Sequence, residues 1–115
     1  MAVTIYHNPK CGTSRTVLQA LHEGGQEPQV VEYLKAGWTA GQLGELFGKM
    51  GVTARDMLRK KEAIAQELGL TDASATDAAI LKAMVAHPVL VERPIVVTPK
   101  GVFLCRPADR LAAAL

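Results

Sequence analysis

The chain has 115 residues, of which 49% are hydrophobic and 21% are charged. That balance predicts one folded domain with a sizeable core and excludes a disordered chain. The formal net charge is only +2, which argues against nucleic-acid binding through a broad basic face. The apolar stretches are too short to span a bilayer and the first residues lack a signal-peptide pattern, so a cytoplasmic protein without membrane contact is expected.

The first third of the chain predicts a strand–helix–strand unit. Residues 2–6 are rich in β-forming side chains and end at an Asn-Pro turn signal. A helix with one apolar face is predicted over residues 14–23 and is stopped by two glycines. Residues 29–34 then form a second β-rich run. Two strands joined by a helix are expected to pair in parallel.

The middle of the chain, approximately residues 38–88, is predicted to be a helical insertion. Thr39 and Thr76 are suited to cap helices that run to about residues 50 and 86. A shorter helix is expected from Thr53 to the basic cluster at residues 59–61, and residues 62–70 have room for one or two further turns. The helix after Thr76 is expected to turn four apolar side chains inward: Ile80, Leu81, Met84 and Val85.

The last third of the chain returns to strands. Residues 95–98 and 102–105 are β-rich runs on either side of a Pro-Lys-Gly turn, which predicts an antiparallel hairpin. A short C-terminal helix is expected after it, from the Arg106-Pro107 pair through Leu115. The fold class is therefore α/β: a mixed four-stranded sheet flanked by helices, in a single domain that spans residues 1–115.

Cys11 is the best candidate nucleophile because it lies where the first strand gives way to the first helix. Unpaired N–H groups and the helix dipole favour negative charge at that position. A thiolate there has a pKa lowered from about 8.5 to roughly 3.5–7.5, and the thiolate is the form that attacks. Lys10 and Arg15 add positive charge, and His7 is near enough in sequence to turn back toward the loop. An inert buried cysteine is the alternative interpretation.

The residues after Cys11 are suited to an oxyanion loop. Gly12 allows a ligand to approach the backbone closely, Thr13 and Ser14 offer hydroxyl donors, and Arg15 offers positive charge. N–H groups at a helix start readily bind phosphate-like anions. The sequence thus predicts a bound oxyanion beside the Cys11 sulfur.

The second cysteine and the histidines are less informative. The two cysteines and three histidines lack metal-ligand spacing, so no metal site is predicted. Cys105 shares a strand face with Phe103, which is typical of a packed thiol, and a resolving thiol near Cys11 is the alternative. A structural disulfide between the two cysteines is not expected in a reducing cytosol.

Four segments, in order along nearly the whole chain, resemble the ArsC-type, glutaredoxin-dependent arsenate reductases. His7-Asn8-Pro9-Lys10-Cys11-Gly12-Thr13-Ser14-Arg15 resembles the active-site loop of that family. The other three segments are Leu58-Arg59-Lys60, Glu92-Arg93-Pro94-Ile95-Val96-Val97-Thr98-Pro99 and Leu104-Cys105-Arg106-Pro107. The resemblance implies a thioredoxin-like fold and a cis bond between Arg93 and Pro94.

The resemblance also implies roles for individual residues. Arg59, Arg93 and Arg106 are expected around the oxyanion and the thiolate. Guanidinium groups match tetrahedral anions, stay charged and can hold Cys11 ionised. His7 is expected near the nucleophile, where it orients the thiolate or, if protonated, lowers its pKa. The alternatives are solvated surface arginines and a turn-forming histidine with no part in the chemistry.

The implied reaction is the reduction of arsenate to arsenite in three steps. The Cys11 thiolate forms an ester with arsenate, glutathione reduces the arsenic, and glutaredoxin clears the mixed disulfide. No bound cofactor is expected, and glutathione is a co-substrate. The partners implied are arsenate, glutathione and glutaredoxin, with no nucleic acid and no membrane.

Other functions are compatible with parts of the same pattern. A monothiol glutaredoxin-like protein would share the single-cysteine loop, but the arginines argue against it. A regulator related to Spx, which binds RNA polymerase, uses a second cysteine for its redox switch; Ser14 stands at that position here, which weakens the switch but not all such binding. A phosphatase of the C-x5-R type would need its arginine later than Arg15. A family member with the fold and little arsenate turnover is the remaining alternative.

Overall fold

The computed structural model describes residues 2–115, which fold as two compact units. The sheet unit contains the chain up to Ala36 together with Arg93–Leu115, and the helical unit contains Gly37–Glu92. The sheet unit is therefore assembled from both ends of the chain, and the helical unit is a continuous insertion. Each unit is described by itself below.

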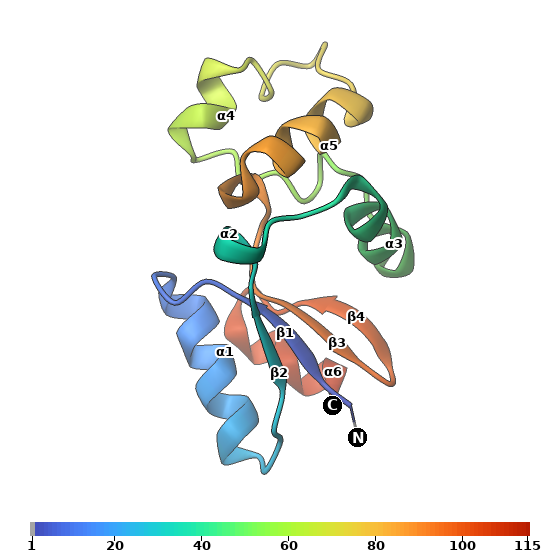
Figure 1. Cartoon of the computed structure of the whole chain (residues 1–115). Helices are drawn as coiled ribbons and strands as arrows, with labels where there is room; N and C mark the ends of the chain where they lie inside the picture. Colours follow the sequence, from blue (N-terminus) through green and yellow to red (C-terminus); the bar gives the residue numbers. More distant parts are fainter. Residues whose placement is uncertain (1) are drawn as a thin grey trace. The chain divides into compact units, whose positions relative to one another are not determined.

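The sheet unit is built on four short strands in the order β2-β1-β3-β4 (Figure 1). β1 lies in the middle, parallel to β2 and antiparallel to β3, and β3 pairs with β4 as an antiparallel hairpin. The predicted mixed four-stranded sheet is confirmed. The strand bounds are Thr4–His7, Gln29–Glu32, Ile95–Thr98 and Gly101–Leu104 for β1 to β4.

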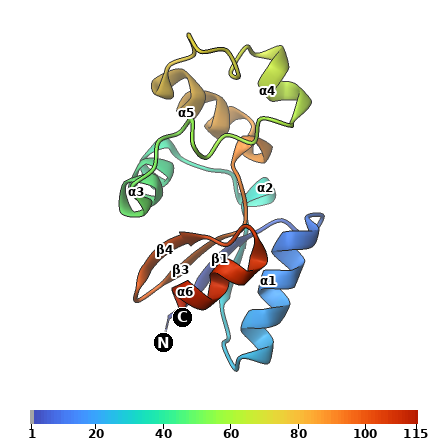
Figure 2. The ribbon, with the colours of Figure 1, turned by 180° about the vertical axis from the view of Figure 1, so that it is seen from behind.

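Two helices cover one face of this sheet. α1 spans Gly12–Glu23, and the short α6 spans Leu111–Ala114 after a turn of 3-10 helix, η2, at Ala108–Arg110. Seen from behind, α1 and α6 lie in front of the strands (Figure 2). Their apolar sides meet the strands in one core cluster, which contains Val3, Ile5, Val17, Leu21, Val96, Cys105, Leu111 and Ala114. Burial of these side chains is the main force that holds the sheet unit together.

The second strand is shorter than the sequence predicts. The β-rich run was expected to extend to residue 34, but β2 ends at Glu32 and the short helix α2 occupies Tyr33–Ala36. The reason lies in the pairing, because His7 opposite Glu32 is the last partner that β1 offers. Tyr33 then leaves the ladder and is buried, with 1% of its surface exposed.

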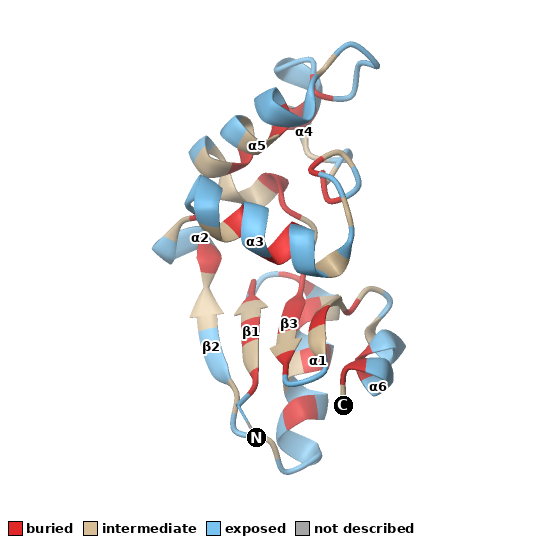
Figure 3. Ribbon diagram, turned by 90° about the vertical axis from the view of Figure 1, so that its right-hand side faces the viewer, coloured by how far each residue is buried: buried red, intermediate tan, exposed pale blue. Residues whose placement is uncertain are grey.

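Two helices of the helical unit, α3 and α5, begin at the caps that the sequence predicts. The Thr39 hydroxyl accepts a hydrogen bond from the Gln42 N–H at 3.1 Å, and Thr76 accepts one from Ala79 at 3.1 Å. These bonds satisfy N–H groups that a helix start leaves unpaired. Figure 3 shows buried positions recurring between exposed ones along α3. The elements of this unit are α3 at Ala40–Met50, α4 at Ala63–Glu67, α5 at Asp77–Ala86 and the 3-10 turn η1 at Pro88–Leu90.

The helix predicted over residues 53–61 is not formed. Thr53 and Asp56 exchange side-chain-to-backbone hydrogen bonds of 2.9 and 3.1 Å, as at a helix start, but only a turn follows. The chain then straightens, because Leu58 forms an antiparallel bridge with Val91. Tertiary pairing with a distant segment therefore overrides the local helical tendency.

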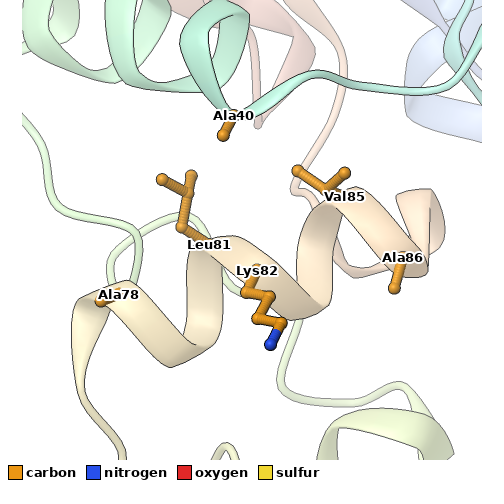
Figure 4. Close-up of a pocket in the computed structure, with 6 residues that line it drawn as sticks. All are labelled: Ala40, Ala78, Leu81, Lys82, Val85 and Ala86. Atoms are coloured by element: carbon orange, nitrogen blue, oxygen red, sulfur yellow. The ribbon is translucent and has the colours of Figure 1, made fainter.

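The sequence predicts that four apolar side chains of the helix after Thr76 face inward, and two of the four are fully buried. Ile80 and Met84 are fully buried, but Leu81 and Val85 are only half-buried. These last two side chains line an open apolar groove of about 450 Å³ (Figure 4). Its other lining residues are Ala40, Ala78, Lys82 and Ala86.

Within residues 2–115, none of the helices is both long and apolar enough to cross a membrane.

Replacing Leu21 by Ala should destabilise the sheet unit strongly, because Leu21 is fully buried in its core cluster. We expect a loss of about 2–5 kcal/mol in the free energy of unfolding, measured by urea denaturation. Leu68→Ala is the matched control, since 48% of Leu68 is exposed, and it should change stability by less than about 0.5 kcal/mol. Similar losses for both variants would contradict this description of the core.

Candidate active site

Cys11 occupies the N-cap position of α1, as the sequence predicts. β1 ends at His7, and a turn closes when the Cys11 N–H donates to the Asn8 carbonyl at 3.0 Å. The Cys11 carbonyl then accepts the first helical hydrogen bond, from the Arg15 N–H at 3.0 Å. The side chain closes no capping hydrogen bond of full geometry, but the Ser14 N–H interacts with the sulfur. The thiol thus lies at the positive end of a twelve-residue helix.

Two arginines from the far end of the chain meet this thiol. Arg106 follows β4 and places its Nη1 atom 3.6 Å from Cys11 Sγ. The same Nη1 donates to the Arg93 carbonyl at 3.4 Å, and the Arg93 side chain also hydrogen-bonds the sulfur. Arg93 precedes β3 and is only 6% exposed. The sheet therefore brings together three of the predicted site residues, because β3 and β4 return the chain to β1.

Both arginines are followed by a cis proline. The Arg93–Pro94 bond is cis, as the family resemblance implies, and so is the Arg106–Pro107 bond, which was not expected from the sequence.

These surroundings set the ionisation of Cys11. Burial alone would raise the pKa of the thiol, since only 9% of the residue is exposed. The Ser14 N–H, the hydrogen bonds from Arg93 and Arg106, and the Arg93 charge oppose that effect and outweigh it. The pKa of Cys11 is therefore lowered from its ordinary value, and the nucleophilic thiolate is favoured.

His7 acts on the loop through Ser14. Its Nδ1 atom lies 2.6 Å from the Ser14 hydroxyl oxygen, which also accepts a hydrogen bond from the Asn8 N–H at 3.1 Å. All three residues are buried. Burial lowers the pKa of His7; the Glu32 charge opposes this and the Arg15 charge adds to it. A neutral imidazole is thus favoured, and it fixes the first turn of α1 rather than supplying positive charge.

Asn8 is a loop residue that sequence reasoning missed. Its carbonyl accepts the Cys11 N–H, its side-chain Oδ1 accepts the Lys10 N–H at 2.9 Å, and its own N–H donates to Ser14. These bonds fix the turn that presents the sulfur. The Asn-Pro pair was the available signal, because Asn side chains commonly hydrogen-bond the backbone two residues later in turns.

The predicted oxyanion loop divides into exposed and buried positions. Gly12 and Arg15 are exposed, Thr13 is half-buried and Ser14 is fully buried. The Arg15 Nη1 donates to the Pro9 carbonyl at 2.9 Å, so its guanidinium folds back over the loop. Gly12 is thus an exposed position at the start of α1, and N–H groups at a helix start readily bind oxyanions.

Arg59 belongs to the helical unit. Its Nε atom lies 2.9 Å from a Glu62 carboxylate oxygen, and its Nη1 atom lies 3.6 Å from Glu92. The side chain is 21% exposed. Arg59 is thus neither a solvated surface charge nor fully buried.

The environment of Cys105 has the opposite effect on its thiol from that of Cys11. It is fully buried in the core cluster of the sheet unit, with Phe103 packed against that cluster. Burial raises its pKa to about 11. Both cysteines are free thiols. A neutral, enclosed thiol is suited to packing and poorly suited to resolving Cys11.

No three His, Cys, Asp or Glu side chains among residues 2–115 gather in a way that could hold a metal ion.

A mixed four-stranded sheet with an ionisable cysteine at the β1–α1 junction, in contact with arginines that precede cis prolines, defines a thioredoxin-like thiol protein. Comparisons with known proteins narrow this class. The model of the ArsC family matches residues 6–114. The chain therefore belongs to the ArsC family.

Individual relatives agree with that assignment. The chain is 55% identical to the arsenate reductase ArsI2 of Synechocystis over 93% of its own length and 76% of that protein. It is 45% identical to the arsenate reductase of Escherichia coli K12, again over 93% and 76% of the two chains. The solved structure of an arsenate reductase from Vibrio cholerae, 40% identical, superimposes with a TM-score of 0.94 and covers 100% of this chain and 98% of that one.

Replacing Arg106 by Ala should raise the pKa of Cys11, because one hydrogen-bond donor to the thiolate is lost. The measurement is the rate of iodoacetamide alkylation against pH, with Cys11→Ser identifying the reactive thiol. Arg110→Ala removes an equal charge from an exposed position and should leave the profile unchanged. An unchanged profile in Arg106→Ala would contradict the stabilising role of that arginine.

Cys105 should make the protein less stable at alkaline pH. Its pKa in the folded protein is about 11, against 9.0 for an ordinary thiol, which represents the unfolded chain. The unfolded state therefore loses its proton first, and stability falls as pH rises from the lower value toward the higher. The stability advantage of wild type over Cys105→Ala should shrink by roughly 2–3 kcal/mol across that range, measured by urea denaturation. A constant difference would contradict the buried neutral thiol.

Proposed function

We propose that this chain reduces arsenate to arsenite at the Cys11 thiolate, with glutathione as co-substrate and glutaredoxin as the protein that restores the enzyme. The observation that carries the proposal is the position of Cys11 at the start of α1, with the Arg106 Nη1 atom 3.6 Å from its sulfur. Relatives of 45–55% identity that are named arsenate reductases support the substrate. The site has both requirements of the first step, a nucleophilic sulfur and fixed positive charge for an oxyanion.

In the first step, the Cys11 thiolate attacks the arsenic atom of arsenate. A sulfur–arsenic bond forms and one arsenate oxygen leaves as water or hydroxide. Arg93 and Arg106 hold the anion and offset the charge that develops on its oxygens. The N–H groups at the start of α1 add further donors on the side of Gly12.

In the second step, the glutathione thiolate attacks the Cys11 sulfur. A disulfide forms between glutathione and Cys11, and the sulfur–arsenic bond breaks with its electron pair staying on arsenic. Arsenic(V) thereby becomes arsenic(III). In the third step, glutaredoxin removes glutathione from Cys11 by thiol–disulfide exchange. Because two thiols supply the two electrons, the reaction requires no resident redox cofactor.

Arg59 and His7 complete the proposed machinery. Arg59 is the third arginine for the oxyanion and is already oriented within the helical unit by Glu62. His7 positions the first turn of α1 through Ser14, so its effect on Cys11 is indirect. The sheet unit and the helical unit are proposed to act together as a single domain. A cytoplasmic location follows from the proposed dependence on glutathione and glutaredoxin.

The test is arsenate-dependent NADPH consumption in the presence of glutathione, glutaredoxin and glutathione reductase. Wild type should consume NADPH and Cys11→Ser should lose all detectable turnover. Arg59→Ala, Arg93→Ala and Arg106→Ala should each lower kcat/KM by about 10²-fold or more. Omitting glutaredoxin alone should stop the steady state but leave one turnover.

No arsenate-dependent turnover in folded wild type would overturn the function. Turnover with thioredoxin but not glutaredoxin would overturn only the proposed electron donors.

A further inference from the structure

The loop that carries Cys11 has an exposed rim with positive charge. Pro9, Lys10, Gly12 and Arg15 are exposed, whereas only 9% of Cys11 is exposed. These four residues, the loop rim, are the solvent-facing part of the segment that presents the sulfur. All of them belong to the sheet unit.

The guanidinium of Arg15 is fixed over this rim. Its Nη1 atom donates to the Pro9 carbonyl at 2.9 Å. Its Nη2 atom lies 3.7 Å from the position that a β-carbon on Gly12 would occupy. The Arg15 backbone is fixed as well, because its N–H donates to the Cys11 carbonyl at 3.0 Å. The charge is therefore held along the segment from Pro9 to Gly12, and Cys11 lies within that segment.

Arg15 differs from the two arginines that contact the sulfur. Arg93 is 6% exposed and Arg106 is half-buried, and both hydrogen-bond the sulfur. The pKa of Cys11 is lowered by these two residues and by the Ser14 N–H. Removal of the Arg15 charge is therefore expected to leave the ionisation of Cys11 nearly unchanged, so this exposed arginine is available for another purpose.

The protein does not neutralise the Arg15 charge with a carboxylate. The ion pairs among residues 2–115 join carboxylates to Lys35, Lys49 and Arg59, and not to Arg15. The planar fork of a guanidinium matches the geometry of a carboxylate. Arg15 is therefore suited to bind a carboxylate on a reactant that comes from solvent.

Glutathione has the chemistry that this arginine would recognise. Besides its thiol it carries two carboxylates and one ammonium group, so it is an anion at neutral pH. Its carboxylates lie several bonds away from the thiol. An arginine that is displaced along the loop from the Cys11 sulfur therefore fits a peptide thiol better than a small oxyanion bound at the sulfur itself.

We propose that Arg15 is a specificity-determining residue that binds a carboxylate of glutathione while its thiol reacts at Cys11. The proposal rests on the proposed function, in which glutathione is the co-substrate. Arg93 and Arg106 then act at the sulfur, and Arg15 selects the thiol that reaches it. Lys10 adds a second exposed positive charge to the same rim.

The test measures thiol–disulfide exchange at Cys11 in the absence of arsenate. The Cys11 thiolate attacks one sulfur of a symmetric disulfide, a mixed disulfide forms, and the other half leaves as a thiolate. Oxidised glutathione is an anionic reagent, bis(2-hydroxyethyl) disulfide is neutral and cystamine is cationic. In Arg15→Gln, exchange with oxidised glutathione should slow by about two- to five-fold relative to wild type. Exchange with the neutral reagent should be unchanged, and exchange with cystamine should not slow.

Three controls isolate the charge of Arg15. Arg110→Gln removes an equal charge from an exposed position in the same unit and should slow none of the three reactions. Cys11→Ser gives the background without the nucleophile. Alkylation by uncharged iodoacetamide should follow the same pH profile in Arg15→Gln and wild type. Added salt should reduce the difference between the two proteins toward oxidised glutathione.

In the coupled assay with arsenate, the KM for glutathione should rise in Arg15→Gln by about the same factor as the exchange rate falls. Equal slowing with all three disulfides, a shifted alkylation profile, or a rise in the KM for arsenate alone would overturn the inference.

The two proposals can fail separately. A selective loss with oxidised glutathione, in a wild type that does not turn over arsenate, would overturn the proposed reduction and keep the role of Arg15. Arsenate turnover with glutathione, together with unchanged exchange in Arg15→Gln, would overturn the role of Arg15 alone.

Discussion

The site depends on keeping a negative sulfur stable in a place that is largely shielded from water. Cys11 is only 9% exposed, and burial by itself opposes ionisation. The Ser14 N–H at the helix N-terminus is the largest effect that opposes burial and lowers the pKa of Cys11, and hydrogen bonds from Arg93 and Arg106 add to it. These residues lie more than eighty positions later in the chain. The sheet topology, with β3 and β4 returning beside β1, is what makes the thiolate stable.

The two cysteines show that environment, and not residue type, decides the chemistry of a thiol. Cys11 and Cys105 belong to the same small unit. Cys11 meets donors and guanidinium groups, whereas Cys105 meets only the apolar core and has a pKa of about 11. Arg106 directly follows Cys105, yet it turns to the Cys11 sulfur. One short segment thus supplies a core side chain and a site side chain in succession.

In the helical unit, Arg59 is paired with acidic side chains. Glu62 lies at its Nε atom and Glu92 near its Nη1 atom, so the Arg59 charge is partly neutralised in its half-buried position. A guanidinium with no counter-charge would pay a larger desolvation cost there. In the sheet unit, by contrast, Arg93 and Arg106 face a thiolate that itself takes part in the proposed reaction.

The sequence by itself determined the elements with strong local signals: the Thr39 and Thr76 caps, the β-rich runs, and Cys11 at a strand-to-helix turn. The resemblance of four segments to a known family identified Arg59, Arg93 and Arg106 as candidate site residues. Only the tertiary structure decided where β2 ends, that Leu58 pairs with Val91 where a helix was predicted, and that Asn8 and Ser14 fix the loop. These features depend on partners distant in sequence or on buried hydrogen bonds, and neither has a local pattern. The ion pair between Glu92 and Arg59 is also known only from the structure, since it depends on the bridge between Leu58 and Val91, which no sequence periodicity predicts.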